Sequence, residues 1–204
     1  MVHRIYVVPI FVFPLLLIVG ILTIPIVSDY SDHILAEKAV SQTGRWFWGH
    51  LISAVAFGSS SLAAYSIFRR LSEKGQVNSG MVSLVLITIG SSLFSCGLGA
   101  DGIGPLATMA GDGRAYTFFE GSGMWVSGIF IAASIIFSLG LFAQLVALIN
   151  AGILKGIIRI IVFGAAIVFC GATVIPSGWG LYVVVVAVLV IYIPIGYVYW
   201  RESS

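Results

Sequence analysis

Residues 180–200, GLYVVVVAVLVIYIPIGYVYW, form an apolar stretch without a single Asp, Glu, Lys or Arg. About 20 apolar residues in a helix cross the roughly 30 Å hydrocarbon core of a bilayer, so this stretch is long enough to span a membrane. Five further stretches are similarly long and apolar: about 5–27, 46–68, 81–98, 124–149 and 157–175, the last with Arg159 near its start. The sequence therefore predicts an all-α integral membrane protein, a six-transmembrane-helix bundle that forms a single domain over residues 1–204.

The composition of the chain indicates the same class. Of its 204 residues 59% are hydrophobic and only 9% are charged, whereas a soluble domain carries about 25% charged residues. The apolar stretches are continuous, unlike the short alternating strands of a membrane barrel. The first stretch is too long for the apolar core of a signal peptide, and no A-x-A cleavage pattern follows it. The ten Lys and Arg residues form no basic stripe, which argues against nucleic-acid binding.

The distribution of basic residues predicts the orientation of the bundle. Six spans place both termini on one side, and Lys and Arg are enriched in cytoplasmic loops. The termini and the loops on their side contain Arg4, Arg69, Arg70, Lys74, Lys155, Arg159 and Arg201. The other side contains Lys38, Arg45 and Arg114. We therefore expect a multi-pass protein of a cell membrane, plasma or inner, with cytoplasmic N- and C-termini.

The outer face is predicted to be acidic and bordered by tryptophans. The acidic residues assigned to it are Asp29, Asp32, Glu37, Asp101, Asp112 and Glu120. Trp46, Trp48, Trp125 and Trp179 fall at the outer ends of spans and Trp200 at an inner end. Amphipathic rings prefer the headgroup region at both surfaces of a bilayer, so these positions agree with the predicted orientation.

The stretch GLGADGIG, residues 97–104, contains the G-x-G-x-x-G spelling of a dinucleotide-binding fingerprint. That fingerprint works where a strand turns into a helix whose N-terminus meets the pyrophosphate. Here the glycines follow a membrane span on the outer side of the membrane, so no nucleotide is expected. The sequence instead predicts a helix end and a long outer loop over 99–123. Its Tyr116, Phe118 and Phe119 indicate that the loop packs onto the helix ends or lies on the membrane.

Apart from Arg159 near the start of 157–175, the predicted spans contain no Asp, Glu, Lys or Arg. Such residues usually mark ion or proton pathways, so their absence argues against a pump, a proton-coupled transporter or an aspartate intramembrane protease. His50, about one turn into the second span, is the nearest ionisable group. It is interpreted as an interfacial histidine with a hydrogen-bond partner, as a pH-sensitive group or as a metal ligand. A metal would be held by His50, Glu120 and Asp101, and no other cofactor is predicted.

Two other residue types have a structural and a chemical interpretation. The serines of the spans and Ser122 in EGSG lack the partner histidine that a serine hydrolase needs, and small residues allow close packing of membrane helices. Cys96 and Cys170 are interpreted as small apolar residues or, alternatively, as a disulfide.

Three functions remain open from the sequence. The first is a non-enzymatic subunit or partner-binding component of a larger membrane assembly, in contact with the lipid bilayer and with a membrane protein partner or a second copy of itself. Its candidate partner- or ligand-binding residues are Trp46, Trp48, Arg114 and Trp125. The second is a binder or carrier of a hydrophobic small molecule or lipid. The third is an outer-face metal or enzyme site around His50.

Overall fold

The computed structural model describes residues 4–28, 32–173 and 178–202, and all regular structure in them is helical. A short 3-10 helix, η1 (Arg4–Tyr6), precedes the first α-helix. The α-helices are α1 (Val8–Thr23), α2 (His33–Val40), α3 (Thr43–Glu73), α4 (Val77–Ala110), α5 (Ala115–Glu120), α6 (Gly123–Asn150), α7 (Gly156–Ala172) and α8 (Gly178–Glu202). The prediction of a helical protein is confirmed.

Six of these helices are apolar, as a helical membrane protein requires. Helices α3, α4, α6 and α8 are each long and apolar enough to cross a bilayer, whereas α1 and α7 are shorter. Along α8 the exposed rings of Trp179 and Trp200 lie about 30 Å apart at 1.5 Å per residue, which matches the hydrocarbon thickness. Residues 174 and 175 of the predicted span 157–175 lie outside the described residues.

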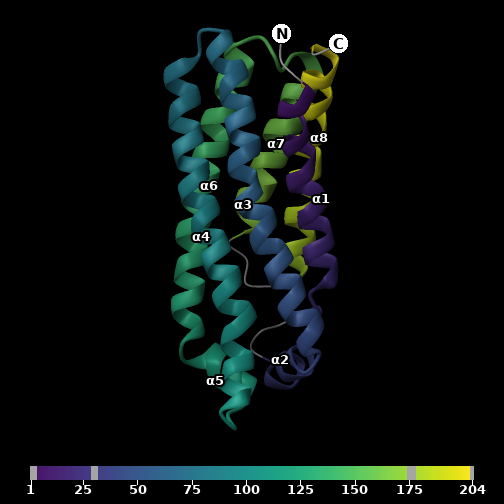
Figure 1. Ribbon diagram of the computed structural model, residues 1–204, viewed down its shortest axis with the longest axis vertical. Coiled ribbons are helices and arrows are strands. Elements are labelled where there is room, and N and C mark those ends of the chain that lie inside the picture. The colour runs from purple at the N-terminus through teal and green to yellow at the C-terminus, as the bar shows by residue number, and fades with distance from the viewer. Residues whose placement is uncertain (1–3, 29–31, 174–177, 203–204) are drawn as a thin grey trace.

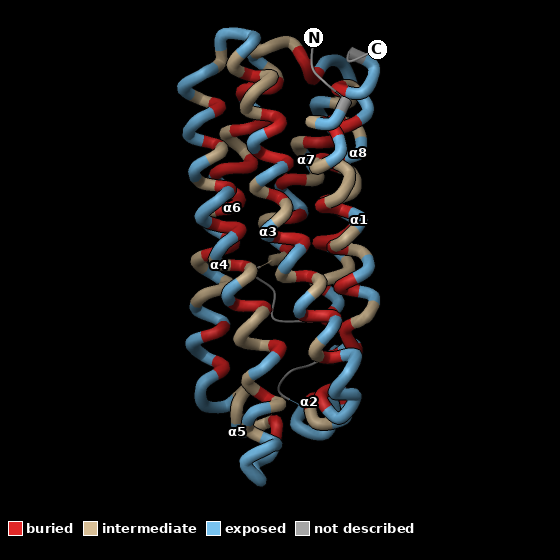
Figure 2. The backbone as a smooth tube through the Cα atoms, in the orientation of Figure 1, coloured by how far each residue is buried: buried red, intermediate tan, exposed pale blue. Residues whose placement is uncertain are grey.

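The six apolar helices form a closed bundle. Each packs on the next in the order α1, α3, α4, α6, α7, α8, and α8 packs back on α1. Helix α1 begins and α8 ends at the same end of the bundle, and α2 and α5 lie at the opposite end (Figure 1). Buried residues face the interior and exposed ones face outward along the helices (Figure 2). The exposed faces carry large aliphatic side chains, among them Leu62, Val85 and Ile135.

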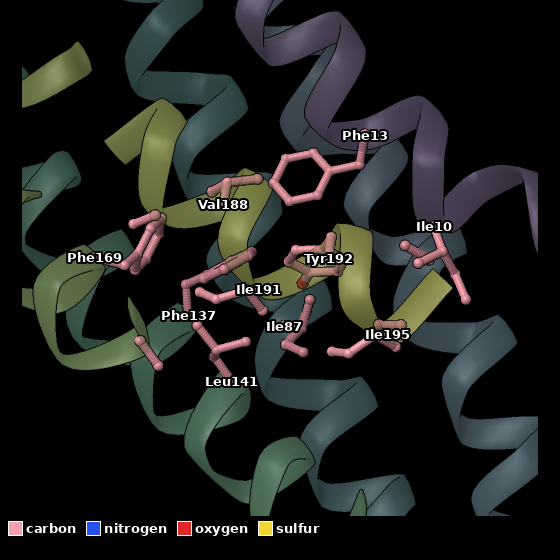
Figure 3. Close-up of a cluster of buried hydrophobic side chains, with 14 of the residues drawn as sticks. Ile10, Phe13, Ile87, Phe137, Leu141, Phe169, Val188, Ile191, Tyr192 and Ile195 are labelled. Carbon is pink, nitrogen blue, oxygen red and sulfur yellow. The ribbon is translucent and has the colours of Figure 1, made fainter. Parts of the chain in front are cut away.

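Aromatic rings fill the centre of the bundle. Phe57 stacks on Phe94 at 4.3 Å, and Tyr192 meets Phe13 edge-on at 5.0 Å. Figure 3 shows Phe13, Ile87 and Tyr192 together in this core, with Phe137 beside them. Because these rings come from five different helices, they join the bundle into one packed core.

Helices α4 and α6 approach each other closely at two glycines. A Cβ atom on Gly90 would lie 2.6 Å from the backbone nitrogen of Phe137, and one on Gly140 would lie 2.7 Å from that of Ile87. No real Cβ atom tolerates such contacts, so the absence of a side chain sets the distance between these helices.

The prediction of a long loop over 99–123 is wrong, because α4 continues through the glycines and Pro105 to Ala110. None of these glycines adopts the positive φ of a helix end. They instead make room for neighbours: a Cβ on Gly102 would lie 2.8 Å from Cβ of His50, and one on Gly104 would overlap the ring of Phe118. The glycine-rich stretch is a packing face, and α4 extends about 51 Å, well beyond the hydrocarbon thickness.

Candidate functional site

The end of the bundle opposite the termini is closed by a small cap. We call α2, α5 and the adjoining ends of α3 and α4 the α2–α5 cap, since these elements contact one another. Asp32 caps α2 by accepting hydrogen bonds from the backbone nitrogens of Ile34 and Leu35 at 3.0 and 3.1 Å. A separate apolar cluster holds the cap together and comprises Val27, Ala39, Val40, Trp46 and Ala115. The cap is therefore an ordered, packed structure.

Trp46 and His50 connect α3 to Asp101 of α4. They lie one turn apart on α3, and they are 0% and 2% exposed. The indole nitrogen of Trp46 donates a hydrogen bond to the backbone oxygen of Asp101 at 3.0 Å. Nε2 of His50 lies 3.2 Å from Oδ2 of Asp101, and Nδ1 lies 2.7 Å from the backbone oxygen of Trp46. The indole and imidazole rings are in contact, with centroids 4.5 Å apart.

These contacts fix where protons can reside. A carbonyl oxygen only accepts, so Nδ1 of His50 carries a proton and donates to Trp46. Nε2 then faces a carboxylate oxygen of Asp101, and a hydrogen bond between these two atoms requires a proton on one of them.

Glu120 contacts a different histidine at the surface of the cap. Its carboxylate lies 2.9 Å from Nε2 of His33. The imidazole of His33 stacks on Tyr116, with centroids 4.6 Å apart and planes inclined by 4°. The guanidinium of Arg114 lies 5.9 Å from the centroid of that ring. These contacts join α2 to α5 across the cap.

The predicted metal ligands are therefore brought together only in part. His50 and Asp101 are in contact, whereas Glu120 contacts His33. Within the described residues no three His, Cys, Asp or Glu side chains are grouped as a metal site requires. Asp29, assigned to the outer face from the sequence, lies outside the part of the chain that the structure describes.

The predicted partner-binding residues also divide into two sets. Trp46 is fully buried and packs within the cap, and its role in binding a partner or ligand stays a prediction. Trp48 and Trp125 are 56% and 74% exposed, and Arg114 is exposed at the start of α5. These three remain available to a partner or to lipid.

The bundle interior contains hydroxyls and one amide. Ser60 of α3 and Ser91 of α4 share a hydrogen bond of 2.5 Å, and Ser95 donates to the backbone oxygen of Ala54 at 2.8 Å. Such bonds join neighbouring membrane helices. Cys96 and Cys170 are both free thiols, so they form no disulfide.

Comparison with known proteins adds no assignment: no family model matches the chain, and neither a characterised protein nor a solved structure is significantly similar to it.

Proposed function

We propose that this chain is a six-span protein of a cell membrane, with both termini in the cytoplasm, and that it acts as a non-enzymatic, partner-binding component of a larger membrane assembly. Six apolar helices packed in a closed bundle support the number of spans. An even number agrees with the start of α1 and the end of α8 lying at one end (Figure 1). The excess of basic residues at that end supports its cytoplasmic side.

The observation that carries the partner-binding role is an exposed aliphatic face on the α2–α5 cap. Helix α2 buries Ala36, Ala39 and Val40 against the bundle. Its opposite face exposes Leu35 and Ile34, the latter to 79%. Helix α2 has only 8 residues, too few to cross a bilayer, and carries Glu37 and Lys38. Large aliphatic groups exposed on such a helix favour a contact with an apolar partner surface.

The interior of the bundle favours this role over transport or catalysis. Its buried polar side chains in the described residues are His50, Ser53, Ser60, Ser66, Ser83, Ser91, Ser134, Ser138 and Gln144. No Asp, Glu, Lys or Arg of these residues is buried among them, so the core offers no charged relay.

The orientation is tested with reporters fused to the C-terminus. We expect a fluorescent protein that matures only in the cytoplasm to be active there, and alkaline phosphatase to be inactive. The same reporters inserted between Asp112 and Gly113 should give the opposite result. If the same reporter were active both at the C-terminus and between Asp112 and Gly113, the two positions would lie on one side of the membrane, which contradicts the six-span topology.

The partner is tested by photo-crosslinking in the native membrane. A photoreactive amino acid at Ile34 should produce a crosslinked species of one defined additional protein mass. The same residue at Leu139 of α6, which is exposed on the apolar belt, serves as the control and should crosslink to lipid. A chain that migrates as a free monomer in mild detergent and yields no protein adduct at residue 34 would overturn the partner-binding role.

A second candidate function rests on the His50–Asp101 pair. Imidazole with carboxylate suits Zn²⁺ or Fe²⁺ when further ligands complete the site. Metal analysis of the chain purified from its own membrane, beside a His50→Ala variant, tests this alternative. Stoichiometric metal in the unmodified chain that is lost in the variant would favour a metal protein over a partner-binding component.

A further inference from the structure

An open groove follows the seam between α6 and α7 on the outside of the bundle. Its lining residues are Ile149, Arg159, Ile160, Phe163, Gly164 and Ile167. All but Arg159 are apolar. The groove therefore combines one cation with an apolar surface.

The shape of the groove follows from the spacing of residues on α7. Ile160, Gly164 and Ile167 recur at helical spacing and share one face of the helix. Phe163 is held against Phe142 of α6, with ring centroids 5.4 Å apart. A Cβ on Gly164 would meet no atom within 4 Å. The middle of the groove is thus open because glycine leaves it unfilled, with isoleucine side chains above and below.

Arg159 lies at one end of the groove with its charge unmatched. It is exposed in the first turn of α7, and Lys155, just before the helix, is exposed too. Within the described residues, the Arg159 guanidinium makes no hydrogen bond or ion pair. The carboxylate of Glu73 at this end of the bundle pairs instead with Arg70 at 2.8 Å.

The position of Arg159 along the bundle corresponds to a headgroup region. Helix α7 begins at the end where α8 ends (Figure 1), and Trp200 and Arg201 lie in the last turn of α8. Trp and Arg at a span end mark the boundary between hydrocarbon and headgroups. The apolar part of the groove then runs from this boundary toward the middle of the membrane, in the direction of an acyl chain.

We infer that the groove binds one anionic phospholipid, with its phosphate on Arg159 and an acyl chain along Ile160, Gly164 and Ile167. Guanidinium groups bind phosphate through charge-assisted hydrogen bonds. The unmatched positive charges of Arg159 and Lys155 favour a headgroup with net negative charge over a zwitterionic one. The inference requires that the bundle lies in a membrane, and it is independent of the proposed partner.

The test is lipid competition on the full chain. The protein is reconstituted in nanodiscs of equal parts phosphatidylglycerol and phosphatidylcholine, and the lipids that stay bound after gentle extraction are counted by native mass spectrometry. We expect one phosphatidylglycerol to be retained preferentially. Arg159→Gln should lower the ratio of phosphatidylglycerol to phosphatidylcholine about fivefold. Lys74→Gln, which removes a cation from the loop at the same end, should leave it unchanged.

Gly164→Leu tests the groove itself. The Cβ of a leucine there meets no atom within 4 Å, and the rest of its side chain occupies the groove. The fold should therefore persist and the retained lipid should be lost. Gly171→Leu is the matched control, because Gly171 is another α7 glycine with no atom within 4 Å of an added Cβ and it does not line the groove. Equal retention in both variants, or an unchanged lipid ratio in Arg159→Gln, would overturn the inference.

A second measurement needs no variant. Phosphatidylglycerol with a photoreactive acyl chain, added to the unmodified protein, should label the peptide that contains residues 156–172. Labelling spread evenly over α1, α4 and α8 would show that lipid covers the bundle without a site. Both experiments use the isolated chain, so a failure to find a protein partner does not change their outcome.

Discussion

Nε2 of His50 on α3 lies 3.2 Å from Oδ2 of Asp101 on α4, and this contact joins the two helices beneath the α2–α5 cap. Nδ1 of the same imidazole donates to the backbone oxygen of Trp46 at 2.7 Å. Both ring nitrogens of His50 therefore have a polar partner. Since the side chain of His50 is almost fully buried, each of these bonds replaces water that the imidazole would otherwise contact, and removing either partner leaves a buried polar atom.

Asp101→Ala should therefore destabilise the protein by about 1–3 kcal/mol, the cost of an unsatisfied buried polar group. Asp101→Asn should retain most of the stability, because its amide nitrogen donates to Nε2 of a neutral His50. Thermal unfolding of the purified variants in detergent measures both. Asp112→Asn removes an exposed carboxylate near the cap and controls for charge. Equal losses in Asp101→Ala and Asp101→Asn would show that an amide donor does not replace the carboxylate in the contact with His50.

Trp46→Phe should lower stability by about 1 kcal/mol or more, because it removes the hydrogen bond to the Asp101 carbonyl and part of a buried ring. Trp48 lies two residues further along α3 and is exposed. Trp48→Phe should therefore leave the unfolding temperature unchanged. The same detergent unfolding assay compares the two. A larger effect at Trp48 would indicate that the exposed ring, and not the buried one, supports the cap.

The cap also shows what could be predicted from the sequence. The six apolar stretches predicted the helices, since their length and composition are sufficient signals. His50 and Asp101 were both placed at the outer end, but their contact depends on α4 remaining helical through Gly97 and Pro105. Local turn signals predicted a helix end there, and packing against His50 and Phe118 overrides them. The burial of Trp46 depends on α5, which carries no apolar stretch that would reveal it.

Which histidine Glu120 contacts could not be predicted from the sequence, for a similar reason. Glu120 could pair with His33 or with His50 as long as 99–123 was a loop of unknown path. The short helix α5 directs Glu120 and Tyr116 toward α2, so Glu120 contacts His33. A helix of this length has no periodicity from which its orientation could be predicted.

Gly140→Ala tests the close approach of α4 and α6. A Cβ there would lie 2.7 Å from the backbone nitrogen of Ile87, so the helices must separate. Overpacking of this kind typically costs about 1–3 kcal/mol. Gly128→Ala is the matched control on the same helix, because its added Cβ meets no atom within 4 Å. We expect Gly128→Ala to unfold at or above the temperature of the unmodified chain, since alanine favours helix over glycine. If Gly128→Ala lost as much stability as Gly140→Ala, the loss would come from the change in helix backbone and not from the contact between α4 and α6.

Tyr192→Phe tests whether polarity in the centre of the bundle stabilises it. The hydroxyl of Tyr192 is buried and has no hydrogen-bond partner in the structure, while its ring meets Phe13 edge-on. Removing the hydroxyl loses no bond and keeps the ring contact, so the free energy of unfolding should stay the same or rise by up to about 1–3 kcal/mol. Tyr192→Leu should instead lower it, because the aromatic pair alone contributes about 0.5–1.5 kcal/mol.

Gln144→Met extends the test to α6, where both amide atoms of the buried side chain lack a partner. If either Tyr192→Phe or Gln144→Met is clearly destabilising, the polar atom makes a bond in the membrane that stabilises the bundle, and the interior is more than an apolar core.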